Sequence, residues 1–287
     1  MELTNPSTLR NILEAYGFSF SKGLGQNFLI DDGVLSDIIE GSGINTDCGA
    51  LEIGPGAGTL TRALCENSKK TVAVEIDNRL IPLLGYTLAD FKNVTVINAD
   101  ILKLNLKELI EREFGSLSVH VVANLPYYIT TPIIMSFLEN DVGVKSLTVM
   151  VQKEVAERMV ADPGSKDYGA LTAAVKFYTE PKIICRAEPH CFMPQPKVAS
   201  VVVNLKVLDK PSVSVNNREF FFKVIRSAFV QRRKTLANAL SHSPFVSLDK
   251  ENVLKCIDKA GLSSDVRGER LSLEQFALLS NLLSRES

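Results

Sequence analysis

The chain has 287 residues, 45% of them hydrophobic and 23% charged, and a formal net charge of −1 at pH 7. This composition is typical of a globular protein that buries a core, and it excludes a disordered or low-complexity chain. The sequence contains no apolar run near the roughly 20 residues of a membrane span, and its first residues lack the pattern of a secretory signal. We therefore expect a protein that does not enter a membrane.

Five cysteines are scattered along the chain, at positions 48, 65, 185, 191 and 256, without the paired spacings of a disulfide framework. A reducing, cytoplasmic compartment is therefore expected. Cys185, His190 and Cys191 lie close in sequence and suggest a metal, but no second pair of cysteines completes a set of four ligands. We therefore expect that these residues bind no metal and that the cysteines are free thiols, either buried or at the surface.

Over the first two hundred residues, short runs rich in Val and Ile alternate with amphipathic segments, which predicts an α/β fold with an open parallel sheet covered by helices on both faces. Two later strands, near residues 174–179 and 198–207, are expected to form an antiparallel edge of the same sheet. The expected parallel strands are residues 50–54, 71–77, 94–99, 119–123 and 146–151, and the helices between them are residues 59–65, 79–84, 104–114 and 132–138.

The pattern changes after residue 208, where an Asp-Lys-Pro sequence marks a boundary. Apolar residues then recur at helical spacing over residues 218–240, and residues 253–260 and 273–283 are expected to form further helices. The chain is therefore expected to have two domains, residues 1–208 built on the sheet and residues 209–287 made of helices alone.

A glycine-rich turn follows the first expected strand, with Gly54, Gly56 and Gly58 at alternate positions. Glycines allow a tight turn and a close approach of the backbone to a ligand. A dinucleotide-binding turn would have its third glycine at position 59, but Thr59 stands there. The spacing is better suited to a sulfonium nucleoside, which lacks the pyrophosphate that needs the amides of a helix N-terminus. Taken alone, such a turn is equally consistent with a structural role.

Carboxylates end the next two expected strands. Glu75 lies 21 residues after Gly54, where it can accept hydrogen bonds from the hydroxyls of a ribose, as the acidic residue of dinucleotide folds does. Asp100 ends the third strand and can accept from an adenine amino group, which Ile76 and Ile101 would sandwich. Each carboxylate alone is as consistent with a helix N-cap. Together with the glycine-rich turn, these carboxylates make three strand ends in a row that could bind a ligand at one sheet edge, and this favours a ligand site.

The fourth expected strand ends in Asn124-Leu125-Pro126-Tyr127-Tyr128. The Asn124 side-chain oxygen and the Leu125 carbonyl can each accept an N–H of an amino group on a flat ring, which orients its lone pair toward an activated methyl group. Pro126 fixes the backbone, and Tyr127 offers a stacking face worth about 1–3 kcal/mol. These features predict methyl transfer to a nucleobase, although a strand-ending turn with core tyrosines is an alternative. Tyr128 is expected only to pack.

A second aromatic residue, Phe192, begins a loop stiffened by Pro194 and Pro196. We expect its ring to hold the base against Tyr127, and a base held in this way must be unpaired or flipped out of its stack. Taken alone, Phe192 is more typical of a core residue.

The two ends of the chain differ in charge. Residues 1–205 carry 18 Lys and Arg against 24 Asp and Glu, a net charge of −6, whereas residues 206–287 carry 14 against 9, a net charge of +5. This asymmetry predicts that the C-terminal part meets a polyanion. A basic run is usually a solvated face, but on this positive segment, opposite an apolar stripe, it favours contacts with phosphate groups. The candidates on the helix expected at residues 218–240 are Lys223, Arg226, Arg232, Arg233 and Lys234.

Taken together, the motifs resemble those of the bacterial small-subunit rRNA adenine dimethyltransferases, the KsgA/RsmA type. The resemblance extends from about residue 20 to the C-terminal helices, and the set of motifs is highly specific, whereas the glycine motif alone would indicate only a methyltransferase. The matching motifs are Gly25-Gln26-Asn27-Phe28-Leu29, residues 52–58, residues 124–128, residues 192–198 and Gln231-Arg232-Arg233-Lys234-Thr235-Leu236.

The resemblance implies a Rossmann-like class I methyltransferase sheet, S-adenosylmethionine as donor and S-adenosylhomocysteine as product. It implies dimethylation at N6 of two adjacent adenosines in the 3′-terminal hairpin of 16S rRNA, in an immature 30S subunit during its biogenesis. It also implies that Asn27, Leu29 and Asn124 contact the donor. We expect a monomer.

Three other readings are weighed against this one. Erythromycin-resistance methyltransferases, which dimethylate one adenosine of 23S rRNA, share the motif at residues 25–29, but the loop at 192–198 and the signature at 231–236 favour the small-subunit enzyme. An rRNA assembly factor that only binds is less consistent with an intact motif at residues 124–127. A glutamine-methylating enzyme with an Asn-Pro-Pro-Tyr motif is disfavoured by Leu125 and by the basic helical domain.

Overall fold

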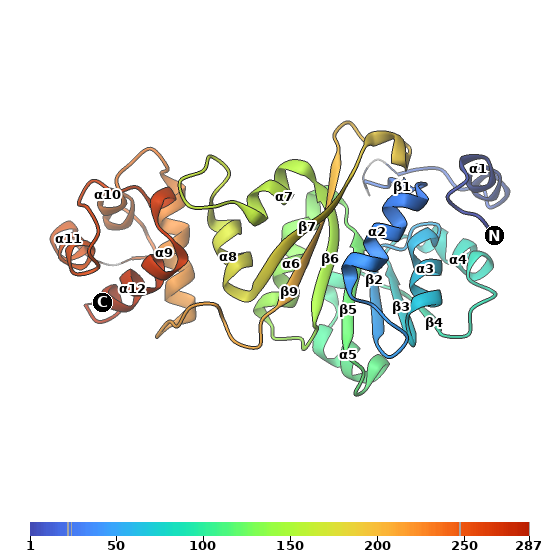
Figure 1. The fold of residues 1–287 in the computed structure, drawn as a ribbon, viewed down its shortest axis with the longest axis horizontal. Coiled ribbons are helices and arrows are strands. Elements are labelled where there is room, and N and C mark those ends of the chain that lie inside the picture. The colour runs from blue at the N-terminus through green and yellow to red at the C-terminus, as the bar shows by residue number, and fades with distance from the viewer. Residues whose placement is uncertain (22, 24, 247, 287) are drawn as a thin grey trace. The chain divides into compact units, whose positions relative to one another are not determined.

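The computed structural model describes residues 1–21, 23, 25–246 and 248–286, and the chain divides into two compact units (Figure 1). Unit 1 comprises Met1–Ala156 and Pro181–Val207, and unit 2 comprises Glu157–Glu180 and Leu208–Ser287. The expected first domain, residues 1–208, therefore contains a segment that belongs with the C-terminal helices. The reason is aromatic packing, because the ring of Phe177 lies 5.2 Å from that of Phe221 in unit 2.

Unit 1 is built on a seven-stranded sheet with the strand order β4-β3-β2-β5-β6-β9-β7. The first five of these pair in parallel, and β6 pairs antiparallel with β9. This confirms the predicted parallel sheet, and β9 confirms one of the two strands expected at its antiparallel edge. The strands are β2 (Gly49–Ile53), β3 (Lys70–Glu75), β4 (Val94–Asn98), β5 (Val119–Asn124), β6 (Ser146–Gln152), β7 (Thr179–Ala187) and β9 (Ser200–Val207).

Helices lie on both sides of the central strands, as Figure 1 shows and as the complete burial of β2 requires. On one side, Ile38 of α2 and Leu64 of α3 pack with Ala50, Val122 and other buried side chains of the sheet. The helices of this unit are α1 (Pro6–Ala15), α2 (Asp32–Ser42), α3 (Thr59–Asn67), α4 (Ile81–Thr87), α5 (Leu106–Phe114) and α6 (Thr130–Glu139), and α7 (Lys153–Val160) runs from this unit into unit 2.

The prediction of a strand near residues 174–179 is wrong. The segment is the end of helix α8 (Ala170–Tyr178), and the edge strand β7 begins only at Thr179. The helix starts where the Gly169 amide donates to Thr172 Oγ1 at 3.1 Å. A short apolar run such as this one has no periodicity that distinguishes a buried helix from a buried strand.

A two-residue strand near the N-terminus, β1 (Phe28–Leu29), pairs antiparallel with β8 (Phe192–Met193). Phe28 lies opposite Met193, and Leu29 lies opposite Phe192. The Ile30 amide also donates to the Cys191 carbonyl at 2.8 Å. Two motifs that are more than 160 residues apart in the chain are thereby joined in one small ribbon.

The part of unit 2 from Leu208 onward has the helices that the sequence predicted, with one difference. The expected long helix at residues 218–240 is two helices, α9 (Arg218–Val230) and α10 (Leu236–Ser241), because Thr235 caps a new helix at the Asn238 amide. The Leu236 amide leaves the helical pattern and donates to Val266 at 2.7 Å. The remaining helices are α11 (Lys250–Lys259) and α12 (Leu273–Leu283).

Among the described residues, no helix combines the length and the apolar character that crossing a membrane requires.

Candidate active site

A pocket opens in unit 1 at the carboxyl ends of β2, β3 and β5. This is the edge at which open α/β sheets bind ligands. The pocket brings together the N-terminal motif, the glycine turn and the motif at residues 124–128. Its lining is formed by residues 25–29, Glu52, residues 54–57, Thr59, Leu60, Glu75, Ile76, Leu80 and residues 124–129.

The glycine turn between β2 and α3 uses backbone conformations that favour glycine, since φ is +70° at Gly54 and +59° at Gly56. At Gly56 there is also no space for a side chain, because an added Cβ would lie 2.8 Å from Cε1 of Phe28. The turn therefore packs its backbone against the N-terminal motif on one side while it faces the pocket on the other. Both glycines lie where the sequence predicted a donor site.

Glu75 is buried at the end of β3, and both of its carboxylate oxygens are oriented by the backbone. Oε2 accepts from the Gly56 amide at 3.3 Å, and Oε1 accepts from the Asp77 amide at 2.8 Å. Burial raises the pKa of Glu75. The helix-cap alternative does not apply to this residue, because Asp77 caps the following turn by accepting from the Arg79 amide. Each Glu75 oxygen has a second lone pair for a ligand hydroxyl.

Asp100 has a different position from Glu75. It caps the short helix η3 (Ile101–Lys103), where Oδ1 accepts from the Leu102 amide at 3.0 Å and Oδ2 lies 3.6 Å from Lys103 Nζ. It is absent from the pocket lining among the described residues, and Ile101 is 5% exposed. Ile76, in contrast, lines the pocket and is 52% exposed. One of the two expected apolar walls is thus in place, and a contact between Asp100 and a donor stays a prediction.

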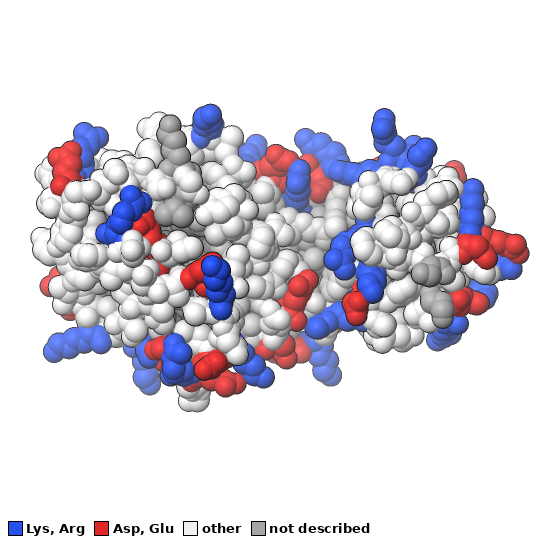
Figure 2. All heavy atoms as spheres, turned by 180° about the vertical axis from the view of Figure 1, so that it is seen from behind, with Lys and Arg blue, Asp and Glu red and all other residues white. Residues whose placement is uncertain are grey.

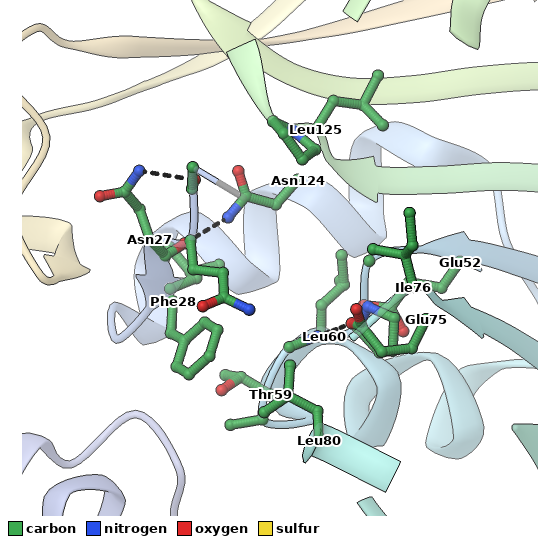
Figure 3. A pocket seen from close by; sticks show the side chains of 18 of the residues that line it. Asn27, Phe28, Glu52, Thr59, Leu60, Glu75, Ile76, Leu80, Asn124 and Leu125 are labelled. Atoms are coloured by element: carbon green, nitrogen blue, oxygen red, sulfur yellow. Dashed lines mark hydrogen bonds between the residues drawn. The ribbon is translucent and has the colours of Figure 1, made fainter. Parts of the chain in front are cut away.

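Asn124 ends β5 with its side chain held in one orientation (Figure 3). Nδ2 donates to the Asn27 carbonyl at 2.8 Å, and the Asn27 side chain in turn donates to the Gly25 carbonyl at 3.1 Å. Oδ1 of Asn124 receives no hydrogen bond from the residues that the structure describes, so both of its lone pairs are available. Figure 3 shows Asn124 and Asn27 on one side of the pocket and Glu75 with Ile76 on the other.

Burial and hydrogen bonds fix the position of the residues that follow Asn124. Leu125 is 1% exposed and its amide donates to the Met150 carbonyl at 3.2 Å. Tyr127 begins the short helix η4 (Tyr127–Ile129), and its hydroxyl lies 2.9 Å from Ser200 Oγ of β9. The Pro126 carbonyl accepts from the Ile129 amide at 3.2 Å. These contacts hold the motif in place beside the pocket, and its role as an acceptor site stays a prediction.

Phe192 does not offer an open face to a base in this structure, which corrects the expectation from the sequence. The residue is 2% exposed and belongs to the core cluster that includes Leu29, Ala50 and Val202. Its position follows from the pairing of β8 with β1, which turns the ring inward beside Leu29. The aromatic residue that lies exposed at the pocket is Tyr128, which is 59% exposed and which we expected only to pack.

Glu52 is a pocket residue that the sequence analysis missed. It lies in the fully buried strand β2, is 1% exposed, and its Oε2 has no hydrogen-bond partner among the described residues. Burial, with a further contribution from Glu75, raises the pKa of Glu52 to about 8. A carboxylate inside an otherwise apolar strand, two residues before the glycine turn, was the signal in the sequence. Burial favours the protonated acid, and a positively charged ligand at this place would favour the ionised form.

The N-terminal motif is tied to β3 through a second residue that spacing did not suggest. Gln26 Nε2 donates to Asp77 Oδ2 at 2.8 Å, and its Oε1 accepts from the Ser21 amide at 2.9 Å. Arg79 Nη2 lies 2.6 Å from the same Asp77 oxygen, and this contact lowers the pKa of Asp77. The segment that covers the pocket is therefore held by polar contacts at Gln26 as well as at Asn27.

The structure brings Asp31 close to two of the residues that suggested a metal. Ligand atoms of Asp31, His190 and Cys191 lie within 4.8 Å of one another. Asp31, however, caps helix α2 at the Val34 amide, and the Cys191 thiol donates to Asp31 Oδ2 at 3.4 Å. The pKa of the Cys191 thiol is raised by burial and by this carboxylate. A hydrogen-bonded thiol and a helix cap account for the arrangement.

The basic residues of unit 2 fall into two groups. Three have partners within the unit: Lys223 pairs with Glu219 at 2.6 Å, Arg232 donates to the Lys166 carbonyl at 2.8 Å, and Arg226 lies over the ring of Phe245 at 5.8 Å. Arg233 and Lys234 are exposed in the turn between α9 and α10, and no carboxylate pairs with them among the described residues.

The charge difference between the units is smaller than the difference between the two parts of the sequence. Unit 2 carries 16 Lys and Arg against 13 Asp and Glu, a net charge of +3, because residues 157–180 add four acidic groups against three basic ones. Unit 1 carries 16 against 20, a net charge of −4. Figure 2 shows basic and acidic side chains interspersed over the face that it draws.

Comparison with known proteins finds relatives that are named as ribosomal RNA methyltransferases. The model of the family described as ribosomal RNA adenine dimethylase matches residues 17–285. The curated Ribosomal RNA small subunit methyltransferase A of Lachnoclostridium phytofermentans is 50% identical over 99% of this chain and 98% of its own length. The protein of the same name from Clostridioides difficile is 46% identical over 98% of this chain and 97% of its own.

Two solved structures resemble the fold over most of its length. A dimethyladenosine transferase from Plasmodium falciparum has a TM-score of 0.72 and 27% identity, and the match covers 88% of this chain and 95% of that one. The 23S rRNA methyltransferase ErmE has a TM-score of 0.70 and 25% identity, and covers 90% of this chain and 100% of its own.

Proposed function

Because the chain belongs to the ribosomal RNA adenine dimethylase family, we propose a specific substrate for this S-adenosylmethionine-dependent rRNA adenine dimethyltransferase. Its acceptors are two adjacent adenosines in the 3′-terminal hairpin of 16S rRNA, each methylated twice at N6 within an immature 30S subunit. The enzyme acts as a cytoplasmic monomer and uses no metal. It has the Rossmann-like class I methyltransferase sheet that the sequence predicted.

The choice of the small subunit is supported by the degree of similarity. Relatives named for the small subunit share 46–50% of their residues with this chain over nearly its whole length. The 23S enzyme ErmE shares 25%. The same fold serves both substrates, so the difference lies in side chains and loops.

The pocket residues fit S-adenosylmethionine, which supplies a methyl group activated by a sulfonium when it is bound. The positive charge of this donor would favour the ionised form of Glu52, whose Oε2 has no partner among the described residues, and Glu75 has free lone pairs for ribose hydroxyls. Gly56 allows the backbone to approach closely, and Ile76 offers an exposed apolar wall for adenine. Asn27 and Leu29 line the same pocket from the N-terminal motif.

The observation that carries the proposal is the orientation of Asn124. An exocyclic amine on adenine delocalises its lone pair into the ring and is a poor nucleophile. Because Nδ2 of Asn124 is engaged by the Asn27 carbonyl, Oδ1 is directed to accept one N–H of that amine. The Leu125 carbonyl accepts the other, and Pro126 fixes its direction. Two acceptors held in place turn the lone pair toward the methyl group, and catalysis follows from positioning.

The RNA is held in part by unit 2. Arg233 and Lys234 are exposed and have no carboxylate partner among the described residues, so their charges are available for phosphate groups. Lys223, Arg226 and Arg232 have partners inside the unit and make a smaller contribution.

The test incubates the protein with labelled S-adenosylmethionine and 30S particles from a strain that lacks this modification, and then digests the RNA to nucleosides. We expect label in dimethyladenosine from the 16S fraction, in two adjacent positions, and none from 50S particles treated in parallel. Label in 23S rRNA alone would assign the protein to the other subunit, and absence of dimethyladenosine from both fractions would reject the proposal.

A further inference from the structure

The aromatic ring of Tyr128 is exposed at the pocket and has no aromatic or hydrogen-bond partner that would indicate a structural role among the described residues. The residue is 59% exposed and lines the pocket beside Tyr127. Among the described residues, its hydroxyl has no hydrogen-bond partner and its ring contacts no other aromatic ring. Tyr127, in contrast, is part-buried and its hydroxyl is held by Ser200. An exposed aromatic ring on a pocket wall is typical of a surface that binds a flat apolar group.

The local backbone directs the two tyrosines differently. They are successive residues of the short helix η4 (Tyr127–Ile129), and a 3₁₀-helix has about three residues per turn, so successive side chains point roughly 120° apart. The two side chains therefore leave the backbone in different directions. They form two separate surfaces at the mouth of one pocket.

The ring of Tyr128 lies near the backbone of Gly25. Gly25 has φ of +61°, and a Cβ added there would lie 3.7 Å from Cε1 of Tyr128 and 3.7 Å from Cβ of Pro126. The turn itself is closed by the hydrogen bonds of the Ile129 amide and the Thr130 hydroxyl to the Pro126 carbonyl, both at 3.2 Å. Because these hydrogen bonds fix the backbone of the turn, only the side-chain torsions of Tyr128 have to be ordered when a base stacks on its ring.

We propose that Tyr128 is a positioning residue that stacks on the nucleobase adjacent to the target adenine, so that the enzyme holds two consecutive bases on two consecutive tyrosines. The proposal rests on the proposed function. When the target base is turned out of the strand, its neighbour loses a stacking partner, and Tyr128 replaces that partner at the pocket mouth. The buried position of Phe192 leaves Tyr128 as the exposed aromatic ring for this role among the described lining residues.

The test compares the full-length wild type with Tyr128→Ala, Tyr128→Phe and Tyr128→Leu. The matched control is Tyr86→Ala, since Tyr86 is 50% exposed in the same unit but does not line the pocket. One measurement is kcat/KM on unmodified 30S particles. A second is the fluorescence of a synthetic RNA hairpin with 2-aminopurine on the 5′ or the 3′ side of the target adenosine, bound with S-adenosylhomocysteine. A third is the affinity for S-adenosylmethionine by calorimetry.

We expect Tyr128→Ala to lower kcat/KM roughly 5- to 150-fold, which is the range that stacking of one base on an aromatic ring contributes. Tyr128→Phe should restore most of this loss, Tyr128→Leu should not, and donor affinity should be unchanged. The 2-aminopurine on one side of the target should be quenched by wild type and by Tyr128→Phe, and brighter with Tyr128→Ala. Tyr86→Ala should match wild type in every measurement.

Wild-type kcat/KM in Tyr128→Ala would overturn the proposal, as would restoration by leucine or an equal loss of donor affinity, which would make the ring merely structural. Unchanged fluorescence at both flanking positions would also overturn it. These outcomes are ratios to wild type and need only an active wild-type enzyme. Failure of the wild type to methylate 16S rRNA is a separate result, which rejects the proposed function itself.

Discussion

The donor side of the pocket and the basic turn of unit 2 use polar groups in opposite ways. At the donor side, Glu75 is buried and both of its oxygens are held by backbone amides. In the turn, Arg233 and Lys234 are exposed, and their charged groups lie at the ends of long side chains. The first arrangement is set by strand geometry and is rigid before a ligand arrives. The second depends on charge and adapts to its partner, so single substitutions should have large effects in the pocket and small ones in the turn.

The largest effect is expected for Asn124→Ala, which removes the acceptor that orients the amine. Loss of one preorganised group at a reacting centre lowers kcat by roughly 10²–10³-fold. Single-turnover methylation of unmodified 30S particles measures this effect, with RNA binding followed in parallel. The control is Asn27→Ala, which keeps the backbone carbonyl that holds Asn124 and should retain far more of kcat. Equal loss of RNA binding and of transfer in Asn124→Ala would indicate a structural residue.

The next effect is expected for Gly56→Ala. The new Cβ would lie 2.8 Å from the ring of Phe28, and φ of +59° is unfavourable for alanine. We expect donor affinity to fall roughly 5- to 150-fold, since strain of this kind costs about 1–3 kcal/mol. Calorimetric titration with S-adenosylmethionine checks the value. Gly85→Ala in α4 is the matched control, because an added Cβ there meets nothing within 4 Å, and it should bind the donor as wild type does.

A smaller effect is expected for the double substitution Arg233→Ala and Lys234→Ala. Each lost phosphate contact should reduce the slope of log K against log salt by about 0.7–0.9. Binding to unmodified 30S particles should weaken severalfold at low salt, with donor affinity intact. Arg232→Ala serves as the comparison, because Arg232 also donates to the Lys166 carbonyl and should cost stability more than it changes the slope. An unchanged slope in the double variant would leave the turn as a solvated surface.

The smallest effect concerns the stability of the free protein and its dependence on pH. Glu52 has a pKa of about 8 in the folded state, well above the ordinary value of 4.5 for a glutamate side chain. The folded protein therefore retains a proton that the unfolded chain releases, and stability falls as the pH rises from about 4.5 to about 8. Glu52→Gln removes this titration, so its melting temperature should exceed that of wild type more at pH 8.5 than at pH 5.5. Because Glu75 titrates in the same direction, the difference between the two proteins is the relevant quantity. The same difference at both pH values would contradict the prediction.

Much of the fold followed from patterns that tertiary contacts do not alter. The five parallel strands appear within one or two residues of their predicted bounds, because runs such as Val119–Asn124 are apolar on both faces. The helix α8 was predicted as a strand because its apolar run is too short to show a period. The break between α9 and α10 escaped notice because Thr235 begins a new helix without interrupting the apolar spacing.

Most residues of the candidate site were also predicted from the sequence. Asn27, Leu29, Gly54, Gly56, Glu75 and the motif at residues 124–127 all line one pocket, as expected from their places at strand ends or in the N-terminal motif. Asp100 lies outside the lining, and Glu52 was overlooked because a single carboxylate in an apolar strand has no spacing signal of its own.

The sequence by itself determined where the polar groups of the site come together, since parallel strands joined by helices place all their carboxyl ends at one edge. Only the tertiary structure decided which aromatic rings are free to meet a base. Pairing of β1 with β8 buries Phe192 beside Leu29, and the turn after Pro126 leaves Tyr128 exposed. It also decided that residues 157–180 belong with the C-terminal helices, because Phe177 packs on Phe221. Exposure and packing depend on contacts between segments far apart in the chain, and no local pattern records them.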